Sequence, residues 1–222
     1  MALLAALAVL AGGVAIIGAP TPVAAQSAPP EPIVFVHGWH GRNSEWDSMR
    51  SRFSASGFPW DRTYTFGYNS DQSIKTSAAQ LNSFIDQVRG WTGSQVVDVV
   101  SHSMGALVSR WCIKSTGCNG KVDDWVSLAG ANHGTSLSLC FWWTSCPQMF
   151  YQSDFVKELN RGDETPGTAT YAALWSDRDT VIVPNSSARL ADGAWNIRVS
   201  IGHNDFQRSQ AVFDIIRPIL VD

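Results

Sequence analysis

The chain has 222 residues, with 16 Lys and Arg against 19 Asp and Glu and a formal net charge of −3. No basic patch stands out in the sequence, and the slightly negative balance argues against a nucleic-acid partner. The length suits one domain with a sizeable core and is short for two.

The N-terminal segment predicts export. Residues 1–17 are almost wholly small or aliphatic, and no charged side chain occurs before Glu31. Val23 and Ala25 fit the recognition step of a signal peptidase. We therefore predict a cleaved secretory signal over residues 1–25 and a single extracellular domain over residues 26–222. The Lys or Arg that normally precedes the apolar run is missing, so a misplaced start codon and an uncleaved anchor are the alternatives.

Short β-branched runs alternate with longer amphipathic stretches along the rest of the chain. The predicted strands are residues 33–36, 63–66, 96–100, 125–128, 170–175 and 197–201. The predicted helices are residues 77–88, 106–114 and 210–220. Strands separated by helices pair in parallel through right-handed crossovers. The predicted fold class is therefore α/β, with a mostly parallel central sheet flanked by helices and reactive residues at the carboxyl ends of its strands.

The strand end at residue 100 carries the strongest motif, Ser101-His102-Ser103-Met104-Gly105. A serine on a tight strand-to-helix turn needs small neighbours two residues to either side, and Ser101 and Gly105 are small. N–H groups at the start of the following helix would face a developing oxyanion. The usual pattern is G-x-S-x-G, so the serine at its first position lowers the specificity of the motif. An ordinary tight turn is the alternative.

A serine hydroxyl needs a histidine base that is oriented by a carboxylate, and in this fold the order along the chain is Ser, acid, His. Two histidines follow Ser103, namely His133 and His203. Asp123 and Asp124 precede their predicted strand, so His133 has no acid at a preceding strand end. His203 directly follows a predicted strand, and we predict that it is the base.

Three aspartates are candidates for the acid. Asp192 lies in a glycine-containing turn and fits a turn former. Asp177 and Asp179 share one loop, and Asp179 directly precedes the apolar segment 180–184, which could support a fixed carboxylate. We favour Asp179.

The expected oxyanion donors are the backbone N–H groups of Met104, after the nucleophile, and of Trp39, in the loop after the first strand. Gly38 and Gly41 would let that loop approach a substrate closely. For the other histidines, we expect structural hydrogen bonds from His37 and His102, a surface loop position for His40, and support of the neighbouring loop by His133.

The four cysteines form two close pairs, Cys112 with Cys118 and Cys140 with Cys146, and each pair encloses five residues. After export, two local disulfides are favoured among the three conceivable pairings, each contributing about 2–3 kcal/mol. A metal site is disfavoured, because the spacing is not C-x₂-C and no histidine lies at ligand spacing.

Several segments together resemble the class 2 bacterial triacylglycerol lipases. They are residues 33–39 (IVFVHGW), 97–104 (VDVVSHSM) and 122–135 (VDDWVSLAGANHGT), with residues 179–185 and 196–203 similar to the acid and histidine regions of that family. The likeness extends over nearly all of the predicted mature chain. It implies a minimal α/β-hydrolase fold without a large lid.

The resemblance also implies roles for individual residues. Ser103 would be the nucleophile, Asp179 the orienting acid and His203 the base, with oxyanion donors from Trp39 and Met104. Family members can carry Ala at the first elbow position, so the serine there is a mild departure. No metal or cofactor is implied.

We therefore expect a secreted serine hydrolase, lipase or esterase, that cleaves acylglycerols or other lipid esters through an acyl-enzyme. A polyester or wax-ester hydrolase and a non-catalytic binding protein are the alternatives. Phe141, Trp142, Trp143 and Phe150 would line an acyl groove, touch a lipid surface transiently or pack in the core. We also expect a monomer, and weak interfacial activation because little chain is left for a helical lid.

Overall fold

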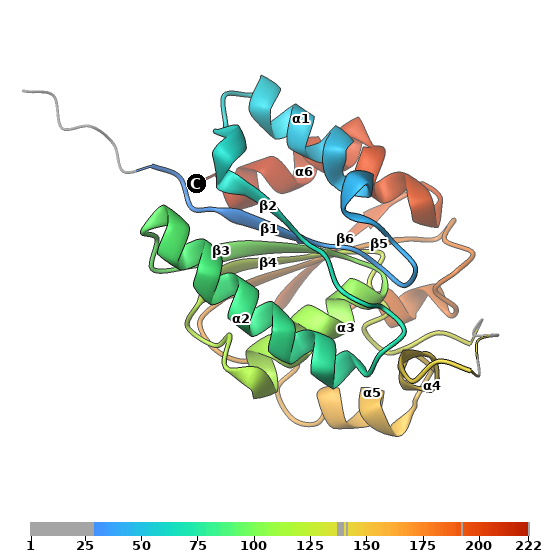
Figure 1. Ribbon diagram of the computed structural model, residues 1–222. Coiled ribbons are helices and arrows are strands. Elements are labelled where there is room, and N and C mark those ends of the chain that lie inside the picture. The colour runs from blue at the N-terminus through green and yellow to red at the C-terminus, as the bar shows by residue number, and fades with distance from the viewer. Residues whose placement is uncertain (1–28, 137–139, 141, 192, 222) are drawn as a thin grey trace, which may run out of the picture.

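A six-stranded parallel sheet forms the centre of the protein (Figure 1). The computed structural model describes residues 29–136, 140, 142–191 and 193–221. The strands are β1 (Ile33–Val36), β2 (Thr63–Phe66), β3 (Val97–His102), β4 (Val122–Leu128), β5 (Thr170–Ser176) and β6 (Ala194–Val199). Their spatial order is β2-β1-β3-β4-β5-β6, and every neighbouring pair is parallel.

Helices cover both faces of this sheet. The α-helices are α1 (Asp47–Ala55), α2 (Ile74–Thr92), α3 (Met104–Trp111), α4 (Ser145–Gln148), α5 (Asp154–Leu159) and α6 (Gln210–Leu220). The short 3-10 helices are η1 (Asn43–Trp46), η2 (Trp60–Arg62), η4 (Asn185–Ala188) and η5 (His203–Arg208), and η3 (Cys112–Thr116) is a π-helical turn. Figure 1 shows α1 and α6 on one face and α2, α3 and α5 on the other.

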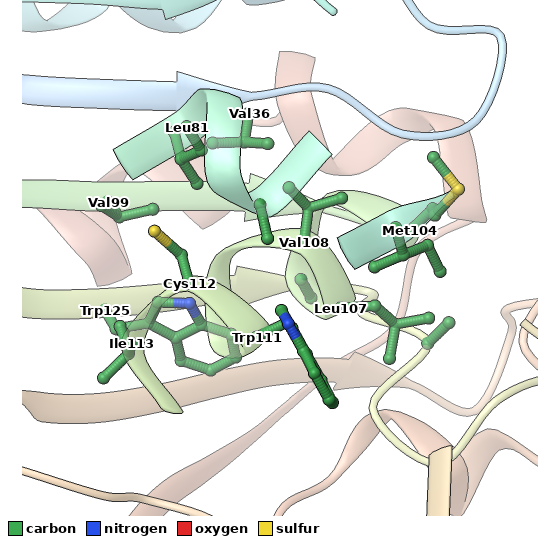
Figure 2. Packing of buried hydrophobic residues seen from close by; sticks show 14 of the residues in the cluster. Val36, Leu81, Val99, Met104, Leu107, Val108, Trp111, Cys112, Ile113 and Trp125 are labelled. Carbon is green, nitrogen blue, oxygen red and sulfur yellow. The ribbon is translucent and has the colours of Figure 1, made fainter. Parts of the chain in front are cut away.

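The core is divided by the sheet into two layers. Ile33 and Phe35 of β1 pack in the layer that includes α1 and α6, whereas Val34 and Val36 pack in the layer that includes α2 and α3. Successive side chains of a strand point to opposite faces. A strand that is buried on both faces is therefore apolar throughout, as β1 is. Figure 2 shows the second layer, where Val36 lies with side chains of α2 and α3.

The predicted fold class is confirmed, and the differences from prediction are local. β4 begins at Val122, so Asp123 and Asp124 lie inside this strand and not before it. Pairing of Val122 with Val97 on β3 extends β4 toward its N-terminal end. The N-terminal end of β4 lies at the opposite end of the sheet from the carboxyl ends of the strands. β6 ends at Val199, so a short loop separates it from His203, which begins η5.

Both predicted cysteine pairings are present as disulfides, Cys112–Cys118 and Cys140–Cys146. The first closes the turn that follows α3. The second joins Cys140, which precedes α4, to Cys146, which lies within α4. Within the described ranges, no helix has the length and apolar character needed to cross a membrane. The predicted signal over residues 1–25 lies outside the described residues.

Candidate active site

Ser103 occupies a sharp turn between β3 and α3. Its backbone has φ 54° and ψ −122°, a conformation that costs free energy for a residue with a Cβ atom. Gly105 allows the turn to be this tight, because a Cβ atom there would lie 2.7 Å from the carbonyl oxygens of Val36 and His37. The turn therefore brings the start of α3 directly against the end of β1.

The serine at the first elbow position is accommodated by hydrogen bonding. Ser101 is fully buried, and its Oγ lies 2.7 Å from Oγ of Ser109 on α3. Ser109 Oγ also accepts a hydrogen bond from Trp125 Nε1 (2.8 Å) and donates to the carbonyl oxygen of Gly105 (3.0 Å). Since both buried hydroxyls have partners, the departure from glycine carries no unpaired polar group.

Asp179 and His203 are joined directly. Asp179 Oδ2 lies 2.8 Å from His203 Nδ1, and both side chains are buried. The other carboxylate oxygen accepts the backbone N–H groups of Val181 (2.8 Å) and Ile182 (3.0 Å). Burial opposes ionisation of Asp179, but the hydrogen bond and charge interaction with His203 and the two N–H groups outweigh it and lower its pKa. The segment after Asp179 thus supports the carboxylate through its backbone.

The other two aspartates are placed differently. Asp177 is exposed and pairs with Arg198 on β6, an interaction that lowers the pKa of Asp177. Asp192 lies outside the described residues. Of the two aspartates in the loop after β5, the structure therefore brings Asp179 and not Asp177 to His203.

A cavity of about 640 Å³ opens at the carboxyl ends of the strands, and Gly38, Trp39, Ser103 and His203 all line it. In the described part of the chain, no hydrogen bond joins Ser103 Oγ to the His203 ring. Catalytic hydrogen bonds are often long in unliganded sites and tighten when substrate binds. Met104 is the first residue of α3, where backbone N–H groups have no partner within the helix.

His102 supports the loop that carries His203. Its Nε2 lies 3.0 Å from the carbonyl oxygen of His203, and the two rings are 4.7 Å apart. Burial, with a smaller effect of the neighbouring His203, lowers the pKa of His102 to about 3. The ring is therefore neutral at ordinary pH, and its Nε2–H donates to that carbonyl.

His37 and His40 also make hydrogen bonds near the cavity. His37 Nδ1 lies 2.8 Å from the carbonyl oxygen of Gly38, and the His37 ring stacks on Tyr68. His40 Nε2 lies 2.7 Å from Asp71 Oδ1, which also accepts a hydrogen bond from Trp39 Nε1 (3.2 Å). Asp71 was not identified from the sequence, since it lies in a loop about thirty residues from both partners.

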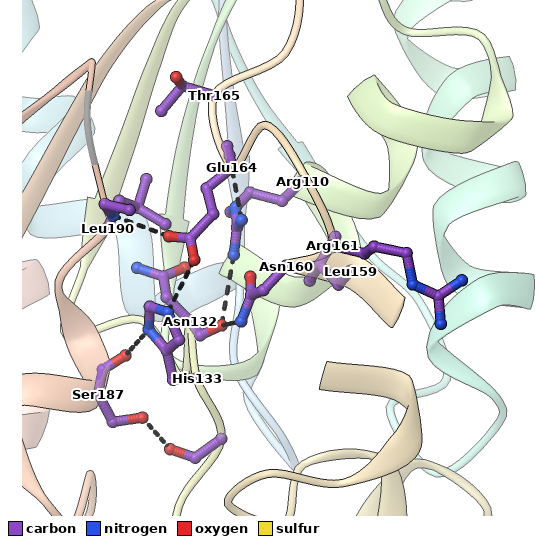
Figure 3. A network of polar contacts seen from close by, with 12 residues as sticks. Arg110, Asn132, His133, Leu159, Asn160, Arg161, Glu164, Thr165, Ser187 and Leu190 are labelled. Atoms are coloured by element: carbon purple, nitrogen blue, oxygen red, sulfur yellow. Dashed lines mark hydrogen bonds and ion pairs between the residues drawn. The ribbon is translucent and has the colours of Figure 1, made fainter. Parts of the chain in front are cut away.

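A polar network around the buried Arg110 and Asn132 adjoins the loop that follows β4 (Figure 3). Arg110 of α3 donates to the carbonyl oxygens of Asn132 (3.3 Å) and Glu164 (3.0 Å). His133 Nε2 lies 3.0 Å from the Glu164 carboxylate, and His133 Nδ1 lies 3.3 Å from the carbonyl oxygen of Ser187. His133 therefore has a structural partner on each ring nitrogen. Sequence patterns gave no signal for Arg110 or Glu164.

Thr135 connects this loop to the segment that carries the aspartate. Its Oγ1 donates to the carbonyl oxygen of Val181 (2.6 Å) and accepts the N–H of Val183 (3.1 Å). The backbone of Val181 also donates to Asp179. The position of the Asp179 carboxylate thus depends on the loop after β4.

The sequence model of the class 2 lipase family matches residues 30–208 of this chain. The chain belongs to that family. This class 2 lipase is also similar to solved structures. The mature form of the Bacillus licheniformis lipase BlEst2 superposes with a TM-score of 0.74 at 18% identity, covering 91% of this chain and 96% of that one.

Two further structures share the fold. Aspergillus fumigatus lipase B gives a TM-score of 0.69 at 18% identity, over 87% of this chain and 54% of that one. The metagenomic carboxyl esterase MGS0156 gives a TM-score of 0.60 at 14% identity, over 87% of this chain and 70% of that one. The family supports ester hydrolysis by this chain, and the structural likenesses show its α/β-hydrolase fold.

Proposed function

We propose that this class 2 lipase is a secreted serine hydrolase of carboxylic esters, with Ser103 as nucleophile, His203 as base and Asp179 as orienting acid. The observation that carries the proposal is the hydrogen bond between Asp179 Oδ2 and His203 Nδ1, beside a cavity that Ser103 also lines. Proposed oxyanion donors are the backbone N–H groups of Trp39 and Met104.

The proposed reaction is acyl transfer through a covalent intermediate. His203 Nε2 takes the proton of Ser103 Oγ as the oxygen attacks the ester carbonyl carbon. The oxyanion is stabilised by the N–H groups of Trp39 and Met104. When the carbon–oxygen bond to the alcohol breaks, His203 returns the proton to the leaving oxygen. Water, activated in the same way, then hydrolyses the acyl-serine and releases the acid.

The apolar part of the cavity is the proposed acyl site. Trp143, Met149 and Ile182 line it, and an aliphatic chain packed on these side chains would be removed from water. Trp142 is 83% exposed, which favours a transient contact with a lipid surface. Phe150 is half-buried against the core, and Phe141 lies outside the described residues.

Weak interfacial activation is part of the proposal. Among the described residues, the chain between the lining residues Trp143 and Met149 forms only the four-residue α4, and no large helical lid covers the cavity. A substrate could therefore enter without a large rearrangement. The rate should rise smoothly through the solubility limit of a triacylglycerol, and a sharp jump there would contradict this expectation.

Export is supported by the two disulfides, which persist in oxidising compartments. A cleaved signal over residues 1–25 would account for that location. The monomeric state stays a prediction.

A fluorophosphonate probe tests the proposed chemistry, because it phosphonylates only an activated serine. We expect stoichiometric labelling of the secreted protein, with the modified peptide containing Ser103. A non-catalytic binding protein on this fold would not react. A panel of p-nitrophenyl esters with two to eighteen acyl carbons, extended to a polyester and a wax ester, then separates lipase, esterase and the alternative hydrolases.

A further inference from the structure

The cavity has a polar part as well as an apolar part. Besides His102, Ser103, Thr135 and His203, four polar side chains line it, and these four come from two short helices: Glu45 from η1, and Asn204, Gln207 and Arg208 from η5. The two helices are tied together, since Gln207 Nε2 donates to Glu45 Oε2 (3.2 Å). Gln207 is itself only 4% exposed, which fixes its amide within the wall.

Because Gly41 has no side chain, there is room beside it for the Glu45 carboxylate. A Cβ atom at Gly41 would lie 2.9 Å from Glu45 Oε2. The loop that carries Trp39 therefore passes beside the Glu45 carboxylate without covering it, and Glu45 remains part of the cavity wall.

The position of His203 indicates which half of an ester meets this wall. In the proposed reaction, His203 returns a proton to the oxygen of the leaving alcohol, so that alcohol must lie beside the His203 ring. His203 is the first residue of η5, the helix that supplies Asn204, Gln207 and Arg208. The alcohol half of the ester is therefore directed toward the polar wall, and the acyl half toward Trp143 and Met149.

We propose that Glu45, Asn204, Gln207 and Arg208 form an alcohol subsite for an uncharged polyol, so that the preferred substrates are esters of glycerol or another polyol with free hydroxyl groups. This inference rests on the proposed function. Hydroxyl groups donate to the Glu45 carboxylate and accept from the amides and the guanidinium. A hydrocarbon alcohol would displace water from these groups without replacing its hydrogen bonds, which is unfavourable. The single negative and single positive charge balance, so no charged head group is favoured.

The test compares two esters with the same acyl chain and the same number of alcohol carbons, 1-octanoylglycerol and propyl octanoate. We expect the unmodified protein to favour the glycerol ester in kcat/KM by about tenfold, because a site built to hydrogen-bond a hydroxyl group rejects the analogue that lacks it. Glu45→Ala and Arg208→Ala should each lower this ratio at least several-fold. Asp47→Ala, which removes a nearby exposed carboxylate outside the cavity lining, should leave the ratio unchanged.

A ratio near one in the unmodified protein would overturn the subsite, as would a ratio that neither Glu45→Ala nor Arg208→Ala alters. Hydrolysis of p-nitrophenyl octanoate reports on acyl transfer without a polyol and is measured in parallel. If that ester is cleaved while the ratio is near one, the subsite fails and the proposed function stands. If none of the three octanoate esters is cleaved and the fluorophosphonate probe labels no serine, the proposed function fails and the subsite fails with it.

Discussion

Asp179 binds His203 through one carboxylate oxygen and the backbone of its own loop through the other. The contact to His203 Nδ1 is 2.8 Å, and the N–H groups of Val181 and Ile182 lie at 2.8 and 3.0 Å from the second oxygen. The carboxylate therefore cannot rotate without losing hydrogen bonds. Such an arrangement fixes the histidine with its proton on Nδ1 and leaves Nε2 to accept one from a nucleophile.

Asp179→Asn is expected to lower kcat by about 10⁴-fold, because the amide that replaces Oδ2 no longer accepts the Nδ1 proton. Asp177→Asn is the matched control, since it changes the same residue type in the same loop but affects the exposed pair with Arg198. We expect that control to stay within about threefold of the unmodified protein. Hydrolysis of p-nitrophenyl butyrate measures both. A collapse of the rate in Asp177→Asn instead would reassign the acid.

The hydrogen-bonded hydroxyls of Ser101 and Ser109, beneath the turn at Ser103, predict that alanine at position 109 is more destabilising than alanine at position 101. Ser109→Ala leaves Trp125 Nε1 and the Ser101 hydroxyl without their shared partner, which should cost about 1–3 kcal/mol of unfolding free energy. Ser101→Ala leaves Ser109 bonded to Trp125 and Gly105 and should cost about 1 kcal/mol or less. Urea unfolding distinguishes the two. Equal or reversed losses would contradict the hydrogen-bond assignment.

Asp98 predicts how stability depends on pH. It is 1% exposed on β3, and burial, reinforced by the charges of Asp124 and Glu31, raises its pKa well above the usual range. The folded protein then binds this proton more tightly than the unfolded chain, whose Asp pKa is about 3.9. The contribution to stability is complete below that value and is lost as the pH rises toward the folded pKa.

Asp98→Asn should therefore raise the melting temperature at pH 8 relative to the unmodified protein, with little gain at pH 4. Asp61→Asn provides a control, because Asp61 is exposed on η2 and is not among the charges that raise the pKa of Asp98. Thermal unfolding followed by circular dichroism at the two pH values makes the comparison. The account of Asp98 fails if the gain is the same at both pH values.

The contacts of the Asp71 carboxylate predict that this side chain holds the loop that carries Trp39 in place. One carboxylate oxygen accepts from Trp39 Nε1 and contacts His40, and the Asp71 carbonyl accepts the N–H of Ser145 (3.3 Å). Asp71→Ala should free the loop and lower kcat by about tenfold, a fraction of the loss expected for a missing oxyanion donor. Asp61→Ala, at an exposed acid on η2, should not change kcat. An unaltered kcat in Asp71→Ala would show that the loop is held by other contacts.

Local patterns were sufficient to predict much of this fold. Residues 33–36 and 63–66 are strands with the predicted bounds, because their apolar and β-branched side chains face packed layers. The motif around Ser103 predicted the strand-to-helix turn. The preference for Asp179 came from the apolar segment after it, although the support proved to come from the backbone N–H groups of that segment.

Contacts between distant segments could not be read from such patterns. The partner of Ser101 lies across a helix on Ser109, and the buried Arg110 meets a carbonyl oxygen 54 positions further along the chain. The sequence alone predicts a later start for β4, because Asp123 and Asp124 are charged and only the pairing of β4 with β3 brings them into the strand. Hydrogen bonds of this kind depend on tertiary packing and have no local periodicity.

The most direct test of the central claim is the rate of ester hydrolysis by Ser103→Ala. The substitution removes only the hydroxyl group and keeps the Cβ atom of the strained turn, so the melting temperature should be nearly unchanged. The account predicts that kcat for p-nitrophenyl butyrate falls by about 10⁴-fold or more and that fluorophosphonate labelling disappears. A folded Ser103→Ala protein that keeps more than about 1% of the unmodified rate would contradict the assignment of the nucleophile.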